Sequence, residues 1–567
     1  MRKEYPLVQP IEEWAILKLS DKRPDVVDEV VKESLKRIKD ATQAQDMTLE
    51  EQIAKTMYLE QARMKDEPWS IDPADEKPFW KDIKKRLIRN EQMLEHNDEE
   101  LNLTNSSLLR EIVLRYTEEI AGHFKIPVFQ FARTVLPVFF SRLLSAVSAK
   151  GFARFFNPNK QLEDKVRLTG EIESLRALAQ KGTVILLPTH SSNLDSILIG
   201  WALDALGLPP FIYGAGLNLF NSRIFGFFMN RLGAYKVDRR KKNYAYNEVL
   251  KTYSTVAIRN GCHSLFFPGG TRSRSGALET KLKLGLMGTA VEAQRLNYKD
   301  APNAEMGKLF VVPLVLSYHF VLEAPSLILQ HLNNVGQDKF FISDESSSYF
   351  QVLKFVWQSF SKDSEIELSF GKPMDIFGNF VDNNGISYDH LGREVDTRAY
   401  FMSKGKITTD LQRDAEYTRM LGEKVVTRFL AENVVFSSHI VAFVGFELLK
   451  RHYPKLDLYS FLRLPEADRG VTQTALLEGV EKALTALKKL ASQGQVRLAE
   501  HLQRSPQEIL QHGIKNLGLY NSRRPLYFMD NEKIGSESLS LLHFYYNRLK
   551  GYYGLEKLFA SGNEKNH

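Results

Sequence analysis

Apolar residues follow two different spacings along the chain, one typical of helices and one typical of strands. In ranges 25–40, 49–64 and 81–96 they recur at steps of three and four residues between charged positions. Ranges 471–491 and 539–549 near the other end show the same pattern. This periodicity places one apolar stripe along a helix, so we predict helical regions at both ends of the chain.

The middle of the chain alternates short aliphatic runs with helical stretches. Runs of this kind predict buried strands, and strands that alternate with helices predict an α/β fold. We therefore expect a mixed sheet flanked by helices over residues 151–375, between an N-terminal helical region at 1–150 and a C-terminal one at 376–567. The predicted strands are 183–188, 211–214, 234–237, 263–268, 309–316 and 365–370.

Two stretches, 129–149 and 434–449, are unusually apolar, but polar or charged residues interrupt both. No uninterrupted apolar run reaches the roughly 18 residues that suggest a membrane span. Each stretch fits either a core helix or a helix lying in a lipid interface. No apolar stretch follows the first residues, so we expect no signal peptide.

Composition narrows the choice of partner and compartment. The 567 residues carry a formal net charge of +7, which suggests a negatively charged partner such as a lipid surface, a phosphorylated substrate or nucleic acid. The single cysteine, Cys262, excludes an internal disulfide, fits a reducing compartment and is expected to be a small buried residue.

His190 and Asp195 lie in a short polar turn between the predicted strand 183–188 and a helical stretch. Residues five apart are about 140° apart around a helix, so the two side chains can meet only if His190 precedes the helix and Asp195 begins it. Ser191, Ser192 and Asn193 are the candidate helix caps. An imidazole held by a carboxylate at one nitrogen can take a proton from an alcohol at the other.

Two basic stretches follow predicted strands further along the chain. The first ends in Arg239-Arg-Lys-Lys242, and the second is the run 266–276, which includes Pro-Gly-Gly-Thr-Arg-Ser-Arg-Ser-Gly. Glycines allow backbone amides to approach an anion, and arginine side chains bind phosphate oxygens with two parallel hydrogen bonds. The second run lacks the G-x-x-x-x-G-K-[ST] order of a P-loop, which disfavours nucleotide hydrolysis.

In order and spacing these stretches resemble the motifs of the glycerophospholipid acyltransferase family. That family has an H-x-x-x-x-D motif, a second block ending in arginine, an F-x-E-G-x-R-S block and a proline-containing strand. The matching parts here are His190 to Asp195, Ala215-Gly-Leu-Asn-Leu through Arg239, Phe267 to Arg274, and Val311-Val-Pro-Leu. The A-G-x-N-L and R-S-R-x-G details look most like the glycerol-3-phosphate 1-O-acyltransferase branch.

The resemblance implies transfer of an acyl group from acyl-CoA or acyl carrier protein to the sn-1 hydroxyl of glycerol-3-phosphate, as in phospholipid biosynthesis. It implies no cofactor, no metal and no nucleic acid, and a peripheral enzyme on the cytoplasmic side of the cell membrane. His190 would be the general base and Asp195 its orienting acid. Substrate-binding roles would fall to Asn218, Arg239, Gly270, Arg272, Ser273, Arg274, Lys283 and Pro313.

Two departures from the family pattern affect the acceptor. Gly269 stands where the third block normally has a glutamate, and Leu217 replaces an aspartate common in the glycerol-3-phosphate branch. The alternatives are an acyltransferase for dihydroxyacetone phosphate or a lysophospholipid, and a lipid-binding homologue without activity. The chain lacks the pattern of basic residues interleaved with aromatic ones that is expected of a nucleic-acid binder, which argues against that function.

Remaining apolar and histidine residues give weaker signals. Within the second block, several apolar residues could line an acyl-chain slot or form ordinary core. His263, His319 and His439 have no neighbours with metal-ligand spacing and are expected to be structural. The apolar residues are Leu219, Phe220, Ile224, Phe225, Phe227, Phe228 and Leu232.

Overall fold

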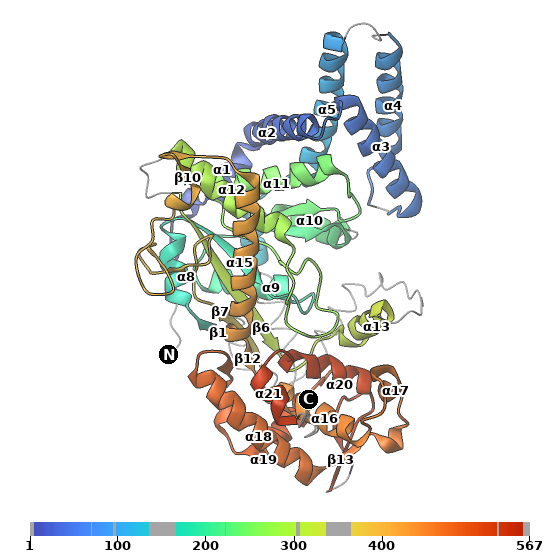
Figure 1. Cartoon of the computed structure of the whole chain (residues 1–567), viewed down its shortest axis with the longest axis vertical. Coiled ribbons are helices and arrows are strands. Elements are labelled where there is room, and N and C mark those ends of the chain that lie inside the picture. Colours follow the sequence, from blue (N-terminus) through green and yellow to red (C-terminus); the bar gives the residue numbers. More distant parts are fainter. Residues whose placement is uncertain are drawn as a thin grey trace.

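The computed structural model describes residues 5–69, 71–93, 98–134, 166–220, 223–301, 307–335, 365–529 and 532–559. Figure 1 shows three parts along the long axis of the molecule: N-terminal helices at one end, an α/β part in the middle and C-terminal helices at the other end. The predicted α/β class with helical regions on both sides is confirmed.

The N-terminal helices pack on the α/β part through one continuous apolar core. α3 begins with a capping box in which Thr48 and Glu51 bond each other's backbone amides, an arrangement that satisfies two free donors of a helix start. Buried residues such as Val30, Leu109 and Tyr246 share the core. The helices are α1 Ala15–Asp21, α2 Arg23–Ala44, α3 Leu49–Asp66, α4 Glu76–Met93 and α5 Asp98–Ile120.

The central sheet has seven strands in the order β1-β7-β6-β2-β5-β3-β4. Strands β6, β2, β5, β3 and β4 are parallel, whereas β7 is antiparallel to β6 and parallel to β1. The carboxyl ends of the five parallel strands therefore share one edge, the usual location of a site in an open α/β sheet. The strands are β1 Val166–Gly170, β2 Thr183–Pro188, β3 Ile212–Gly216, β4 Ala234–Val237, β5 Ser264–Leu265, β6 Leu309–Tyr318 and β7 Ile366–Phe370.

Helices cover both faces of this sheet, which explains why β2 is apolar at every position from 184 to 187. Side chains alternate between faces along a strand. Accordingly, Val184 and Leu186 belong to one core with α9, while Ile185 and Leu187 belong to another with α12 and α15. The helices are α8 Ile172–Ala179, α9 Asp195–Ala205, α10 Arg223–Arg231, α11 Tyr244–Arg259, α12 Leu284–Asp300, α13 Ala324–Val335 and α15 Leu411–Glu432.

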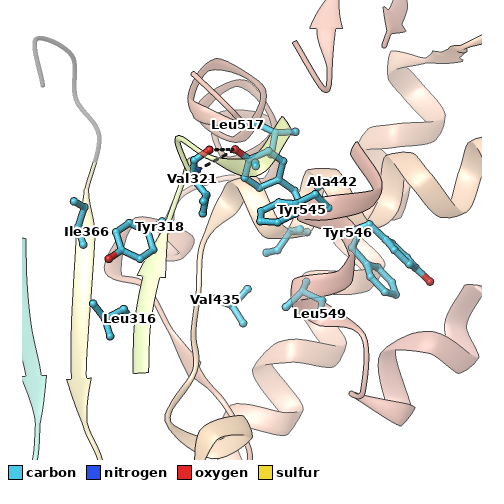
Figure 2. Close-up of a cluster of buried hydrophobic side chains, with 14 of the residues drawn as sticks. Leu316, Tyr318, Val321, Ile366, Val435, Ala442, Leu517, Tyr545, Tyr546 and Leu549 are labelled. Atoms are coloured by element: carbon cyan, nitrogen blue, oxygen red, sulfur yellow. Dashed lines mark hydrogen bonds between the residues drawn. The ribbon is translucent and has the colours of Figure 1, made fainter. Parts of the chain in front are cut away.

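C-terminal helices pack against the end of β6, close to the carboxyl edge of the sheet (Figure 2). Tyr545 fixes the turn after β6, because its hydroxyl accepts a hydrogen bond from the Val321 amide at 3.0 Å. The C-terminal region thus supports residues that border the sheet edge. Its helices are α16 Ser437–His452, α17 Leu458–Leu462, α18 Gln473–Ser492, α19 Pro506–Asn516, α20 Leu539–Tyr546 and α21 Tyr553–Phe559.

Residues 376–410 differ from the helical expectation. They form short paired strands joined by turns, because sequences such as Asp382-Asn-Asn-Gly385 favour turns. Gly385 has a φ of 79°, which glycine adopts easily. The additional short strands are β8 Phe380–Val381, β9 Ser387–Tyr388, β10 Met402–Ser403, β11 Lys406–Ile407, β12 Val434–Val435, β13 Gly470–Thr472, β14 Arg497–Leu498, β15 Tyr527–Phe528 and β16 Lys533–Gly535.

The two apolar stretches have different outcomes. Range 434–449 forms β12 and most of α16, whose residues from Ser437 to Phe446 are all buried, so it is core. Most of range 129–149 lies outside the described residues. Among the described helices, none is both long and apolar enough to cross a membrane. Cys262 is buried as expected, and burial raises the pKa of its thiol to about 12.

Candidate active site

His190 and Asp195 meet at the carboxyl end of β2, as their spacing predicted. His190 lies in the turn and Asp195 is the first residue of α9. The imidazole Nδ1 is 2.8 Å from Asp195 Oδ2. Because an ionised carboxylate only accepts hydrogen bonds, we assign the imidazole proton to Nδ1, which leaves Nε2 as an acceptor. The His190 side chain is 18% exposed, whereas that of Asp195 is fully buried.

The carboxylate of Asp195 is held by the turn itself and by β6. Its Oδ2 accepts the amide hydrogens of Ser191 at 2.6 Å and Ser192 at 2.9 Å. The hydroxyl of Tyr318 donates to Oδ1. Burial, followed by the charge of Asp195, raises the pKa of Tyr318 well above its usual value, so this phenol stays protonated and keeps donating. These donors satisfy the buried charge and fix its direction.

The start of α9 differs from the expected serine or asparagine cap. The residue before the helix is Leu194, which makes no side-chain cap bond. Instead, Asp195 accepts the two serine amides, and Glu323 accepts the Asn193 amide at 2.9 Å and the Ser192 hydroxyl at 3.0 Å. Asp195 and Glu323 thus bind amides of the turn that precedes the helix. Ser192 Oγ accepts the Leu194 amide at 3.2 Å, so it also acts within this turn and does not cap the helix.

The loop after β5 holds the backbone and the ring of His190. Phe267 stacks on the imidazole with ring centroids 4.0 Å apart and planes 24° apart. The Ser273 amide donates to the His190 carbonyl at 2.7 Å. The first and third motifs are therefore in direct contact, although more than 70 residues separate them in sequence.

Three arginines gather beside this turn. Arg239 is exposed at the surface. Partial desolvation, followed by the positive charges of Arg272 and Arg274, lowers the pKa of its guanidinium. Arg272 Nη1 lies 3.4 Å from Glu323 Oε1, which ties it to the start of α9. In the part of the chain that the structure describes, Arg239 and Arg274 form no ion pair with a carboxylate. This cluster of positive charge suits an anionic group such as a phosphate.

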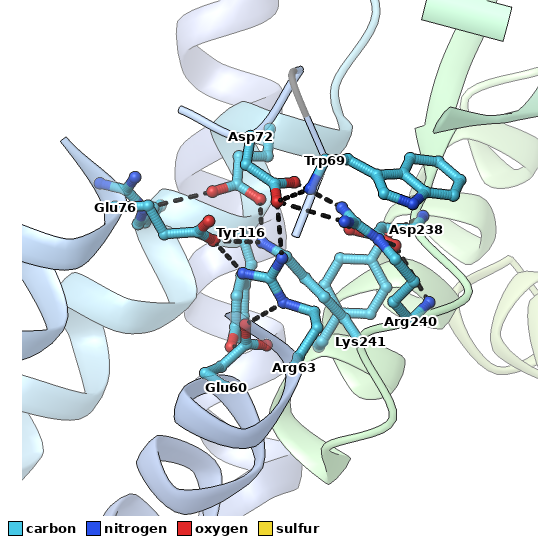
Figure 3. A network of polar contacts seen from close by, with 12 residues as sticks. Glu60, Arg63, Trp69, Asp72, Glu76, Tyr116, Asp238, Arg240 and Lys241 are labelled. Carbon is cyan, nitrogen blue, oxygen red and sulfur yellow. Dashed lines mark hydrogen bonds and ion pairs between the residues drawn. The ribbon is translucent and has the colours of Figure 1, made fainter. Parts of the chain in front are cut away.

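The neighbours of Arg239 in the basic run have another function. Arg240 contacts Asp238 and Asp72, and Lys241 contacts Glu119 and Glu76 (Figure 3). Both cations are buried and neutralised by carboxylates, most of them from the N-terminal helical region. Their contribution is to join that region to the loop after β4, so the expectation of a continuous anion-binding run is wrong for these two.

The other predicted site residues are less directly placed. Ser273 uses its hydroxyl to donate to the Ala277 carbonyl at 2.7 Å, and Lys283 is exposed and packs against Gly270. Pro313 is buried within β6, paired with Leu187, and so belongs to the sheet rather than to the surface of the site. Asn218 lies in a 3-10 turn after β3, but its side chain lies outside the described residues.

Gly270 has a φ of 76°, which favours glycine. Its amide donates to the Phe267 carbonyl at 3.0 Å. That amide is therefore engaged in a turn and is not free to bind an oxyanion in this conformation.

The residues of the predicted acyl-chain slot differ in exposure. Phe220 is buried, so at this position the ordinary-core alternative holds. Phe227 is 48% exposed, and the Arg231 guanidinium lies 3.8 Å from the centre of its ring. The side chains of Leu219, Ile224 and Phe225 lie outside the described residues.

Two of the three histidines examined by spacing are structural, as expected. His263 accepts the Val184 amide at 3.0 Å, and burial lowers its pKa to about 4. Burial also lowers the pKa of His439, to about 3. Both are neutral side chains that contribute hydrogen bonds to the core.

His319 differs, because folding brings it near His501 and His512, with one potential ligand atom from each within 4.8 Å of the others. His501 is already engaged on both sides: its Nε2 accepts the Ser437 amide at 3.1 Å and its Nδ1 is 3.3 Å from Glu365. The amide at the start of α16 also makes this a poor place for a cation. The cluster has the spacing of a metal site, and His319 Nε2 is buried with no hydrogen-bond partner among the described residues, but both ring nitrogens of His501 are already engaged.

Sequence reasoning missed three side chains of the site, Tyr318, Glu323 and Glu279. Tyr318 is the last residue of β6 and Glu323 follows it. Because β6 pairs with β2, the position of both depends on a strand order that spacing alone does not reveal. Glu279 Oε1 accepts the His190 amide at 2.7 Å. Glu279 lies outside the run 266–276 from which the anion-binding loop was predicted.

Comparison with known families fits this geometry. Residues 169–317 match the family model named Acyltransferase. The matched segment contains the His190–Asp195 pair, the three arginines and Glu279. Residues 169–317 are therefore similar to acyltransferase domains, and the predicted resemblance to the glycerophospholipid acyltransferases is confirmed.

Relatives matched by sequence are glycerol-3-phosphate acyltransferases. The protein of Pseudomonas paraeruginosa is 26% identical over 274 residues, 48% of this chain and 28% of the relative. That of Ectopseudomonas mendocina is 26% identical over 270 residues, 47% and 28% of the two chains. That of Pseudomonas savastanoi pv. phaseolicola is 24% identical over 334 residues, 59% and 34%. The matches thus span about a third or less of the relatives' length.

A crystal structure of the 1-acyl-sn-glycerophosphate (LPA) acyltransferase PlsC from Thermotoga maritima overlaps 56% of this chain and 96% of its own, with 14% identity. Its TM-score is 0.23, too low for the overlap to carry an argument.

Proposed function

We propose that this protein transfers an acyl group from the thioester of acyl-CoA or acyl carrier protein to the sn-1 hydroxyl of glycerol-3-phosphate. The observation that carries the proposal is the His190 imidazole, whose Nδ1 is held by Asp195 while the partly exposed ring stacks on Phe267, in the loop that carries Arg272 and Arg274. Glycerol-3-phosphate bound through its phosphate by those arginines would bring its sn-1 hydroxyl toward Nε2 of His190.

In this mechanism Nε2 of His190 takes the proton of the acceptor hydroxyl while the oxygen attacks the thioester carbonyl carbon. The tetrahedral intermediate collapses with cleavage of the carbon–sulfur bond. The thiolate then takes the proton from the imidazolium, and the products are an ester and a free thiol. Asp195 stabilises the imidazolium, and proton transfer by such a group contributes about 10²- to 10⁴-fold in rate.

Arg239, Arg272 and Arg274 would hold the acceptor through its phosphate. Guanidinium groups bind phosphate oxygens with charge-assisted hydrogen bonds, and holding two reactants in the right geometry lowers the barrier of a bimolecular step. The proposal routes no step through a cofactor or a metal, and acyl-CoA or acyl carrier protein acts as co-substrate.

A peripheral position on the cytoplasmic side of the cell membrane is part of the proposal. Phe131 is 53% exposed and stacks with Phe228, next to the exposed Phe227 in α10. Together with the net charge of +7, exposed aromatic residues beside Arg231 suit binding to an anionic lipid surface. Sedimentation with anionic, but not with neutral, vesicles would support this.

The test is thiol release from acyl-CoA and acyl carrier protein by the purified full chain, with lipid present and with competing acceptors. We expect 1-acyl-glycerol-3-phosphate as the main product by mass spectrometry. His190→Ala should lower kcat by about 10³-fold or more, whereas His390→Ala, at an exposed histidine, should leave it unchanged. Undiminished turnover by His190→Ala would reject the mechanism.

The acceptor panel also decides between the alternatives. A dominant product from dihydroxyacetone phosphate or a lysophospholipid would keep the chemistry and replace the acceptor. Vesicle binding without thioester consumption for any acceptor would reject catalysis in favour of a lipid-binding homologue.

A further inference from the structure

The space beside Gly269 is already filled by another side chain. A Cβ atom added at Gly269 would lie 2.9 Å from Cγ and 3.3 Å from Oε1 of Glu279. Gly269 does not have a positive φ, in contrast to Gly270, so its backbone does not require glycine. What requires glycine at 269 is the room taken by Glu279.

Glu279 uses this space to reach the backbone of His190. Its Oε1 accepts the His190 amide at 2.7 Å, while the Ser273 amide donates to the His190 carbonyl at 2.7 Å. Both peptide groups of the presumed base are thus bound to the same loop. The neighbouring Leu278 is 5% exposed and anchors the loop in the core below.

We infer that Glu279 is a positioning residue for His190 and supplies, from ten residues further along the chain, the carboxylate that the family pattern places at position 269. This inference rests on the proposed function, because it assigns the carboxylate to the acyl-transfer site. Glu279 acts on the main chain of His190 and so on the direction of the imidazole.

The space shared by positions 269 and 279 makes this more than an ordinary loop contact. A glutamate at 269 and the present Glu279 cannot occupy the same space, so the glycine at 269 follows from the position of Glu279. Burial is also unfavourable for this carboxylate, since it raises the pKa of Glu279 to about 7. Within the described part of the chain, Glu279 has no ion pair that would offset this cost.

The decisive experiment moves the carboxylate back to position 269 in the full chain. Glu279→Ala should lower kcat about 10- to 100-fold, as a small displacement of a reacting group can, while the KM values stay within about 3-fold. The double variant Gly269→Glu/Glu279→Ala should recover at least 5-fold over Glu279→Ala. Thr280→Ala, at the exposed neighbouring position, is the matched control and should behave as the wild type.

The outcome that overturns the inference is a double variant that is folded and no more active than Glu279→Ala. Wild-type kcat in Glu279→Ala would overturn it as well. Glu279→Gln, whose amide oxygen can still accept the His190 amide, should lose less activity than Glu279→Ala. An equal loss for the two would also count against the inference.

A stability cycle separates this inference from the proposed function. Gly269→Ala should lower the melting temperature in the wild-type background but not in Glu279→Ala, because the added methyl group then has room. Additive effects would overturn the shared-space argument. If the wild type released no thiol from any donor, the proposed function would fail, and non-additivity in the cycle would still establish that the two positions share one space.

Discussion

Arg239 and Arg240 are adjacent in sequence but belong to two very different electrostatic environments. Arg239 has other arginines nearby, and partial desolvation together with their charge lowers its pKa. Arg240 lies between Asp238 and Asp72, and these carboxylates raise its pKa above the usual value despite the opposing effect of burial. The difference teaches that a run of positive charge carries no single function, because each cation is defined by the carboxylates around it.

The paired cluster, made of Arg63, Arg240, Lys241 and the carboxylates around them, is a structural joint (Figure 3). The arginine cluster of the site, made of Arg239, Arg272 and Arg274, has one ion pair among the described residues, between Arg272 and Glu323, and is suited to an anionic ligand. Removing a cation from the first should affect stability, and removing one from the second should affect substrate binding.

Arg63→Met should produce the largest effect, a loss of about 3–5 kcal/mol in the free energy of unfolding of the N-terminal part. Its side chain is 2% exposed and contacts Glu60, Glu76 and Asp72. Those carboxylates would stay buried without their partner. Urea unfolding followed by tryptophan fluorescence measures the loss. A change below about 0.5 kcal/mol would show that the cluster is not a structural joint.

Arg239→Met should leave stability nearly unchanged and lower kcat/KM for glycerol-3-phosphate by about 10- to 100-fold, since a hydrogen bond to a charged group contributes about 1.5–3 kcal/mol. This loss should come from a higher KM for the acceptor, while KM for the acyl donor stays unchanged. Arg274→Met offers a second variant of the same cluster. The contrast would fail if Arg239→Met lost stability while its acceptor KM stayed as in the wild type.

Local spacing predicted the elements of this fold better than their contacts. Six aliphatic runs predicted six strands of the sheet, but β1 was missed because its sequence, Val-Arg-Leu-Thr-Gly, has little apolar character. β5 is only two residues long, because the Pro268-Gly269-Gly270 turn follows closely. Strong periodicity defines an element, whereas its ends depend on turns and on neighbours in space.

The site was predictable to the extent that its residues are close in sequence. His190 and Asp195 are five residues apart, and their meeting followed from one turn. Tyr318 and Glu323 reach the site only through the pairing of β6 with β2. The neutralisation of Arg240 depends on Asp72, 168 residues away. Such long-range contacts have no local pattern from which they could be predicted.

Carboxylates extend the same contrast, because Glu279 is a partly buried acid that has no ion pair within the described ranges, unlike Glu60 or Glu76. Burial raises its pKa from the ordinary 4.5 to about 7. Between these two values the folded protein keeps a proton that the unfolded chain has already lost. Unfolding then releases that proton, so the free energy of unfolding falls as the pH rises from about 5 to 8.

Glu279→Gln removes this titration, so its stability relative to the wild type should increase from pH 5 to pH 8 by about 1–2 kcal/mol, given about 1.4 kcal/mol per pKa unit and partial solvent contact. Urea unfolding at both pH values measures the change, and Thr280→Ala, at the exposed neighbouring position, serves as the control whose difference from the wild type should not depend on pH. A constant difference between wild type and Glu279→Gln across this range would mean that the carboxyl is ionised throughout. In that case the loop after β5 gives it more compensation than its contacts indicate, and the contrast between paired and unpaired acids would have to be given up.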